Sequence, residues 1–118
     1  MSTQEIADRL TDLCRQGKFK TAVEELYAQD AVSIEPHATP AFDKETKGLE
    51  AILAKGEKWG SMAETKEITV SDPLVTGNVF ALTMRMSVVM KDRGPMDISE
   101  LCVYQAKDDK IVSEQFFM

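Results

Sequence analysis

The sequence predicts an α+β fold in which helices come first and a largely antiparallel sheet fills the second half of the chain. Apolar residues recur at helical spacing before residue 63 and alternate with polar residues after it. Gly77-Asn78 and Asp108-Asp109 separate alternating segments by lengths that suit tight hairpins. Consecutive strands are therefore expected to pair antiparallel.

The bulk composition is that of one globular domain. The chain has 118 residues, of which 43% are hydrophobic and 29% charged, so residues 1–118 are expected to form a single domain. A formal charge of -6 argues against nucleic acid or an anionic membrane surface as the main partner. The first residues lack the apolar run of a signal peptide, and no segment has the length of a membrane span. We therefore expect a cytoplasmic protein.

Cofactor and metal chemistry are not predicted. The two cysteines, Cys14 and Cys102, fall in a helical and a strand pattern and are expected to be buried, reduced thiols. A single histidine and no clustered cysteines cannot supply a typical zinc site. There is also no glycine-rich phosphate loop and no nucleophile elbow, so no cofactor is expected.

Three helices are expected before residue 63. Ser2 and Glu5 have capping-box spacing, with Ser2 as the cap and Glu5 at the third position of the first helix, and Gly17 is a natural stop after it. Each helix carries an apolar stripe on one face. The stripes are Ile6, Leu10, Leu13 and Cys14 in the first helix, Phe19, Val23, Leu26 and Tyr27 in the second, and Leu49, Ile52, Leu53, Gly56 and Trp59 in the third.

Five strands complete the prediction. The first runs from Ala31 to Glu35 and is closed by Pro36. The loop that follows, Pro36 to Lys47, is long for a small domain, which favours a role as a pocket rim. The four later strands are expected at Thr65 to Val75, Val79 to Lys91, Met96 to Lys107 and Lys110 to Met118.

Alternation along the late strands places two acids inside apolar faces, Glu100 and Glu114. A carboxylate in such a stripe is costly unless it is paired, hydrated or protonated. The apolar faces are Phe80, Leu82, Met84, Met86, Val88 and Met90 in one strand, Met96, Ile98, Cys102 and Tyr104 around Glu100, and Val112, Phe116 and Met118 around Glu114.

Two explanations of these acids stay open. A β-bulge could reverse the alternation, or the face could be open so that the glutamates reach water or an arginine. Alternatively, the face lines a cavity, where a raised pKa makes a carboxyl group useful as an acid or base near neutral pH.

The sequence is similar to a known superfamily over roughly Gln16 to Met118, which is almost the whole chain. The segment LYAQDAVSIEP, from Leu26 to Pro36, followed by GLEAI, from Gly48 to Ile52, resembles the opening of nuclear-transport-factor-2-like proteins. Ketosteroid isomerases and SnoaL-like polyketide cyclases are the nearest relatives of this kind. The resemblance implies a cone-shaped roll of the cystatin-like type, with three N-terminal helices packed on a strongly curved sheet that encloses a pocket. This fold hosts several activities and also plain binding or assembly domains.

The resemblance also implies roles for two acids. In ketosteroid isomerases a carboxylate before the proline that ends the first short strand shuttles the proton, and Glu35 matches it. A second acid on a later strand helps to hold the enolate oxygen, and Glu100 matches that position. These enzymes also use a tyrosine on the first helix, but the segment from Leu10 to Cys14 has none. Tyr104, on the Glu100 face, could substitute for it.

The other candidates have two interpretations each. Glu35 could be an exposed acid at a strand end, and His37 could either tune Glu35 or lie in solvent. Trp59 fits a pocket wall or ordinary core. Met84 and Met86 fit an adaptable wall, a core or a dimer face. The remaining residues expected to line the pocket are Cys102, Tyr104, Glu114 and Phe116.

Three functions are compatible with these residues. The first is a cofactor-free isomerase, cyclase or dehydratase in which Glu35 and Glu100 perform acid–base chemistry on an apolar carbonyl compound. The second is a non-catalytic binding protein for a small apolar ligand, whose polar or cationic end the glutamates select. The third is a dimerisation or assembly module. The resemblance implies a homodimer in any of these cases.

Overall fold

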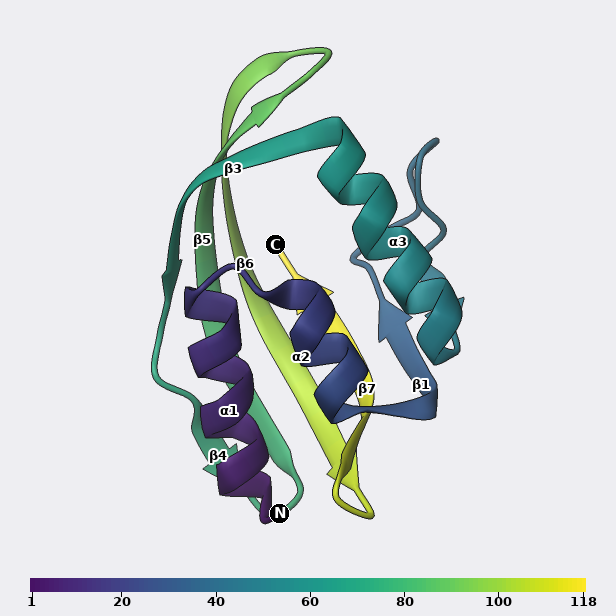
Figure 1. Ribbon diagram of the computed structural model, residues 1–118, viewed down its shortest axis with the longest axis vertical. Helices are drawn as coiled ribbons and strands as arrows, with labels where there is room; N and C mark the ends of the chain where they lie inside the picture. The colour runs from purple at the N-terminus through teal and green to yellow at the C-terminus, as the bar shows by residue number, and fades with distance from the viewer.

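Three helices lie against the inner face of one curled sheet in the computed structural model, which describes residues 1–118 (Figure 1). They are α1 (Thr3–Arg15), α2 (Phe19–Leu26) and α3 (Leu49–Met62). The predicted capping box begins α1: the Glu5 N–H donates to the Ser2 hydroxyl, and the Ser2 N–H donates to the Glu5 carboxylate. Gly17, with φ of 71°, then turns the chain toward α2.

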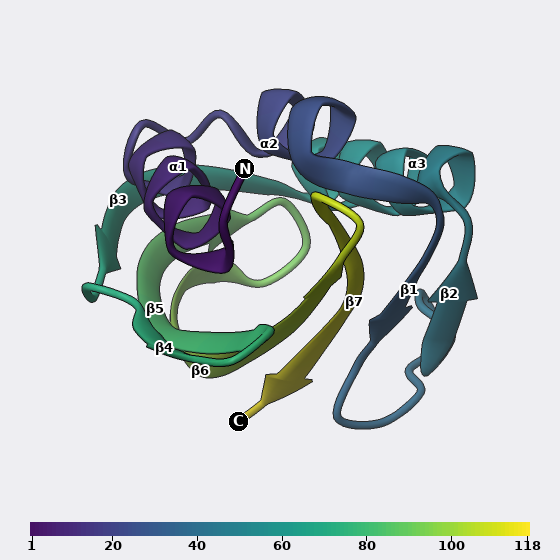
Figure 2. The same cartoon turned by 90° about the horizontal axis from the view of Figure 1, so that it is seen from below.

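Seven strands form the sheet, in the order β2-β1-β7-β6-β5-β3, with β4 also paired to β5. All neighbouring strands are antiparallel except β1 and β7, which run parallel. The sheet curls around α1 without closing on itself (Figure 2). The strands are β1 (Tyr27–Ile34), β2 (Glu45–Lys47), β3 (Ala63–Val70), β4 (Leu74–Thr76), β5 (Val79–Met90), β6 (Gly94–Lys107) and β7 (Lys110–Phe117).

The predicted α+β class and the cone-shaped roll are confirmed, and several boundaries differ. The segment predicted as one strand from Thr65 to Val75 is two strands, because Pro73 lies in the gap and has no N–H to donate. Tyr27 begins β1 and is not the last turn of α2. The loop after Pro36 contains β2, whose three residues pair with β1.

The core lies between the helices and the inner face of the sheet. The predicted inner face of β5 is confirmed, since Phe80, Leu82 and Met84 are buried while Thr83 and Arg85 are exposed. Leu10, Leu13 and Ile6 of α1 belong to the same buried cluster, as do Cys102 and Tyr104 of β6. Phe80 and Tyr104 stack with ring centroids 4.9 Å apart.

One predicted face is wrong because β7 contains a bulge. In the pairing of β6 with β7, Gln105 is opposite Ser113 and Ala106 is opposite Ile111, which leaves Val112 as an extra residue. Ile111 is therefore fully buried in place of Val112. Beyond the bulge the alternation follows the prediction, so Glu114 still points inward.

No helix of the protein is both long and apolar enough to cross a lipid bilayer.

Candidate functional site

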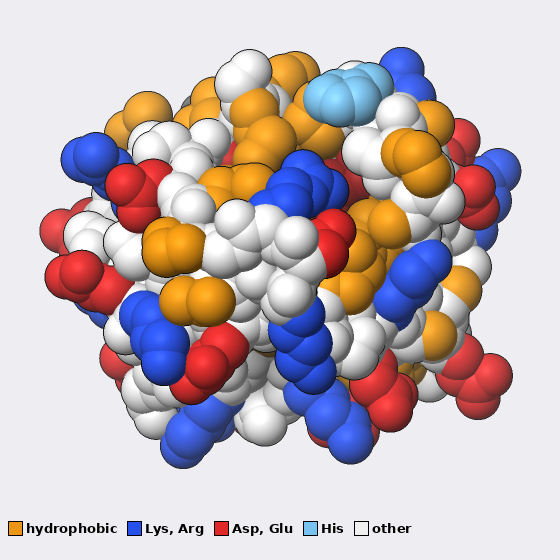
Figure 3. Space-filling view, turned by 90° about the horizontal axis from the view of Figure 1, so that it is seen from above, with side chains coloured by type: hydrophobic (Ala, Val, Ile, Leu, Met, Phe, Trp, Pro, Cys, Tyr) orange, Lys and Arg blue, Asp and Glu red, His pale blue; other side chains and the backbone are white.

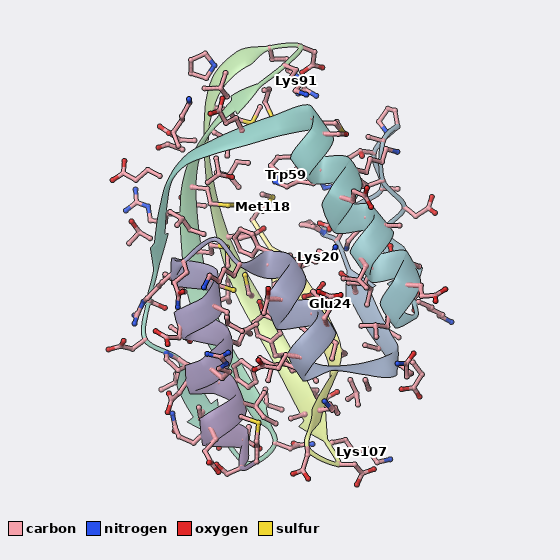
Figure 4. The ribbon with its side chains drawn as sticks, in the orientation of Figure 1. Lys20, Glu24, Trp59, Lys91, Lys107 and Met118 are labelled. Atoms are coloured by element: carbon pink, nitrogen blue, oxygen red, sulfur yellow. The ribbon has the colours of Figure 1, made fainter.

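An apolar cavity of about 310 Å³ lies between the helices and the inner face of the sheet. Twenty residues line it, and 15 of them are hydrophobic. Trp59, which projects from α3, and Met118, at the chain end, both lie in the space between α3 and the long strands (Figure 4). The polar residues of the lining are Glu35, Lys55, Glu100 and Glu114.

Most of the residues predicted for the pocket line this cavity. They are Glu35, Trp59, Met84, Met86, Glu100, Tyr104, Glu114 and Phe116.

Two predicted residues lie elsewhere. His37 is exposed on the surface and does not line the cavity, although Glu35 before it and Phe42 after it do. It is the pale blue side chain in Figure 3. Cys102 points to the expected face of β6 but is completely buried in the core, so it lies behind the cavity wall.

Glu100 lies in the cavity wall on β6 with one weak hydrogen-bond partner. The Cys102 thiol donates to Glu100 Oε1 at 3.7 Å. Burial raises the pKa of Glu100 from 4.5 to about 7, and the negative charge of Glu35 adds to the rise. At neutral pH this carboxyl group is therefore divided between its acid and carboxylate forms.

Glu114 is held more firmly at the base of the cavity. It is 6% exposed and accepts hydrogen bonds from the Tyr27 hydroxyl and, at 2.6 Å, from the Ser33 hydroxyl. Burial raises the pKa of Glu114, while the two hydrogen bonds act in the opposite direction. All of its buried polar atoms have partners, which limits the cost of burying a carboxyl group here.

Glu35 forms an ion pair with Lys55, a residue of α3 that also lines the cavity. The distance from Lys55 Nζ to Glu35 Oε1 is 3.0 Å, and the side chains are 15% and 28% exposed. The same ammonium group donates to the Ser33 hydroxyl. A continuous chain of hydrogen bonds thus runs from Glu35 through Lys55 and Ser33 to Glu114 and Tyr27.

Sequence reasoning missed three members of this chain, Tyr27, Ser33 and Lys55. Two of them carried a local signal. Ser33 alternates with Ala31 and Glu35, so all three lie on one face of the first strand. Lys55 stands three residues after Ile52 on the apolar stripe of the third helix. Tyr27 carried no such signal, since its pattern favoured the second helix.

The arrangement suits proton transfer near neutral pH. A carboxylate beside a cation, Glu35, and a carboxyl group with a pKa near 7, Glu100, share one apolar cavity. A low-dielectric wall strengthens the interaction of both with a polar group of a ligand. No three histidine, cysteine, aspartate or glutamate side chains are grouped so that they could hold a metal ion.

Comparison with known proteins gives the family. The model of the SnoaL-like domain matches residues 1–118. A structure from Mesorhizobium loti, described as a candidate SnoaL-like polyketide cyclase, is 32% identical with a TM-score of 0.94, and 100% of each chain is covered. A comparison with curated proteins gave no match.

Two more distant structures share the fold. A candidate isomerase from Bacillus subtilis is 19% identical with a TM-score of 0.76, over 98% of this chain and 88% of that one. A protein with a ketosteroid isomerase-like fold from Catenulispora acidiphila, solved in complex with trimethylamine, is 18% identical with a TM-score of 0.76, over 99% and 87%. With the family model covering the whole chain, the protein belongs to the SnoaL-like domain family.

Proposed function

We propose that the protein is a cofactor-independent acid–base enzyme that acts on a small apolar carbonyl compound, as an isomerase, a cyclase or a dehydratase. The observation that carries the proposal is the presence of Glu35 and Glu100 in one apolar cavity. Structural ion pairs also perturb pKa values, but a perturbed carboxyl group that lines a cavity is the typical setting of acid–base catalysis.

Each acid has a distinct role in this mechanism. Glu35, which forms an ion pair with Lys55, removes a proton from the carbon next to the carbonyl group. Glu100 in its acid form donates a hydrogen bond to the carbonyl oxygen, where negative charge develops. The resulting enolate is reprotonated at another carbon in an isomerase, attacks a second carbonyl in a cyclase, or expels a β-substituent in a dehydratase.

The cavity restricts the substrate to a small molecule. Its volume of about 310 Å³ is at the lower end of the range of about 300–1,000 Å³ for ligand pockets. The walls are mostly aliphatic and aromatic, so a carbonyl compound with an apolar body fits best.

Hydrogen–deuterium exchange tests the proposal without knowledge of the natural substrate. Small ketones and 1,3-dicarbonyl compounds are incubated with the protein in D2O, and loss of the α-proton signal is followed by NMR. Glu35→Gln is expected to slow the exchange by about 10²–10⁴-fold, the usual contribution of a general base. Glu57→Gln, which changes an exposed acid on α3, should leave the rate unchanged. Equal rates in the wild type and Glu35→Gln would contradict the proposal.

The pH dependence of exchange identifies the role of Glu100. If its acid form is needed, the rate falls as the pH rises through about 7, and Glu100→Gln loses that dependence. A rate that instead rises through about 7 would make Glu100 the base.

Binding without catalysis is the second candidate. The only protein donor to Glu100 is the weak Cys102 thiol, so an ionised Glu100 can accept a hydrogen bond from a cationic ligand. The relative from Catenulispora acidiphila was solved with trimethylamine. In this case trimethylammonium would bind more tightly above pH 7, Glu100→Gln would abolish the gain, and no carbonyl compound would exchange.

A further inference from the structure

Lys55 has a hydrogen-bond donor that the protein does not use. An ammonium group carries three N–H donors. Two of them reach protein acceptors, Glu35 Oε1 at 3.0 Å and the Ser33 hydroxyl, and the third has none. Because Lys55 lines the cavity and is only 15% exposed, the free donor is available to a molecule inside it.

The surroundings of Lys55 combine acids with an aromatic ring. Glu35, the residue that follows β1, is its ion-pair partner, and Ser33 connects Lys55 to Glu114 of β7. The Phe116 ring centroid is 5.7 Å from Nζ. The positive charge of Lys55 also opposes the rise in the pKa of Glu100 on β6, so its field extends across the cavity to that wall.

We propose that Lys55 is a catalytic residue that donates its free N–H to the carbonyl oxygen of the substrate and stabilises the enolate formed there. The inference rests on the proposed function, and it assigns the oxyanion donor that the segment from Leu10 to Cys14, which has no tyrosine, does not provide. Glu100 supplies a second hydrogen bond to the same oxygen.

The step balances in charge and protons. Glu35 takes a proton from the α-carbon, the C–H electron pair becomes the new C=C bond, and the carbonyl π pair moves to oxygen. Negative charge thus leaves Glu35 and arrives on an oxygen bound to Lys55. Since Glu35 lies 3.0 Å from Nζ, the ammonium faces one negative charge before and after the transfer. A donor that is already in place in this way needs little reorganisation.

The short distance between Glu35 and Lys55 indicates the class of substrate. The Glu35 base and the Lys55 donor are 3.0 Å apart, so the carbonyl group that binds Lys55 and the carbon that loses its proton to Glu35 must be neighbours in one molecule. The substrate is therefore a small, neutral ketone or 1,3-dicarbonyl compound with an α-hydrogen and an apolar body.

A coloured phenol tests the donor without turnover. 4-Nitrophenol resembles an enol in its oxygen and ring, and its ionised form is measured by visible absorbance. The wild type should bind the ionised form, and Lys55→Met should bind about tenfold less phenolate at a given pH. Lys55→Arg, which keeps the charge, should recover part of the difference and shows that the site still folds. The control is Lys20→Met, which changes an exposed lysine labelled on α2 in Figure 4.

Equal phenolate binding by the wild type and Lys55→Met, or no phenolate on the wild type, would overturn the proposal. The exchange assay separates this failure from failure of the proposed function. Lys55→Met is expected to lower kcat by about 10²–10³-fold with little change in KM, the effect of losing one oxyanion donor. If exchange depends on Glu35 but not on Lys55, the function holds and Lys55 is not catalytic. If the wild type catalyses no exchange yet binds phenolate through Lys55, the hydrogen-bond donor role of Lys55 is supported and the proposed acid–base function is wrong.

Discussion

At the scale of single residues, the site depends on how the fold treats its carboxyl groups. Glu100 has little hydrogen bonding and a pKa of about 7, whereas Glu114 is anchored by Tyr27 and Ser33. Two glutamates on neighbouring strands therefore have different environments. This difference in environment allows one fold to provide both a carboxyl group that titrates near neutral pH and a carboxyl group held in place by hydrogen bonds.

The raised pKa of Glu100 predicts how stability changes with pH. The folded state holds the Glu100 proton up to about pH 7, while the unfolded chain releases it near pH 4.5. Stability contributed by this proton is complete below about pH 4.5 and is lost as the pH rises through about 7, by up to about 3 kcal/mol before allowance for solvent screening. The free energy of unfolding in urea should fall less between pH 5 and pH 8 for Glu100→Gln than for the wild type. An equal loss would place Glu100 in water.

The places of two acids could be expected from the sequence. Alternation along a strand pointed to Glu100 and the family resemblance pointed to Glu35, and both line the cavity. The roles of Tyr27 and Lys55 depend on partners 87 and 20 residues away in sequence. No pattern within one element records such contacts, so the hydrogen-bond chain became visible only in the folded structure.

At the scale of elements, helix caps and strand faces follow from short-range sequence. The capping box of α1 and the inner face of β5 were predicted correctly, because each depends on a few neighbouring residues. The parallel pairing of β1 with β7 and the bulge at Val112 were not predicted. Both are set by how distant strands meet, which alternation alone does not encode.

Two glycines give a prediction at this scale. Gly17 follows α1 with φ of 71°, and no atom lies within 4 Å of the position that a Cβ would take, so the cost of Gly17→Ala is purely conformational. It should lower the free energy of unfolding by about 1–2 kcal/mol. Gly60 lies inside α3 with open space around it, and Gly60→Ala should raise stability by about 0.5–1 kcal/mol. Chemical denaturation measures the change in the free energy of unfolding for each variant. Changes of opposite sign support these assignments, and changes of the same sign would contradict them.

At the scale of the whole molecule, the curled sheet both builds the cavity and leaves an outer face. On that face Leu101 of β6 and Phe117 of β7 are paired in register and 40% and 47% exposed. The overall roll was predictable from the order of helices and strands together with the family resemblance. The volume of the cavity was not, because it depends on packing across the entire core.

We propose that the protein is a homodimer, as the family resemblance implies. Sedimentation velocity should then give twice the chain mass of 13.2 kDa. If the outer face is the interface, Leu101→Asp should shift the protein toward monomer, because it places a charge among apolar side chains. A monomeric wild type at micromolar concentration would contradict the proposal.

The central claim is that Glu35 and Glu100 share one apolar cavity and act on each other. Carbon-13 NMR titration of the side-chain carboxyl groups tests it most directly, with Glu100→Gln for assignment. The structure predicts a pKa of about 7 for Glu100 in the wild type and a lower value in Glu35→Gln, because the charge of Glu35 helps to raise it. If Glu100 instead titrates near 4.3, the value of an exposed glutamate, in both proteins, the claim is wrong.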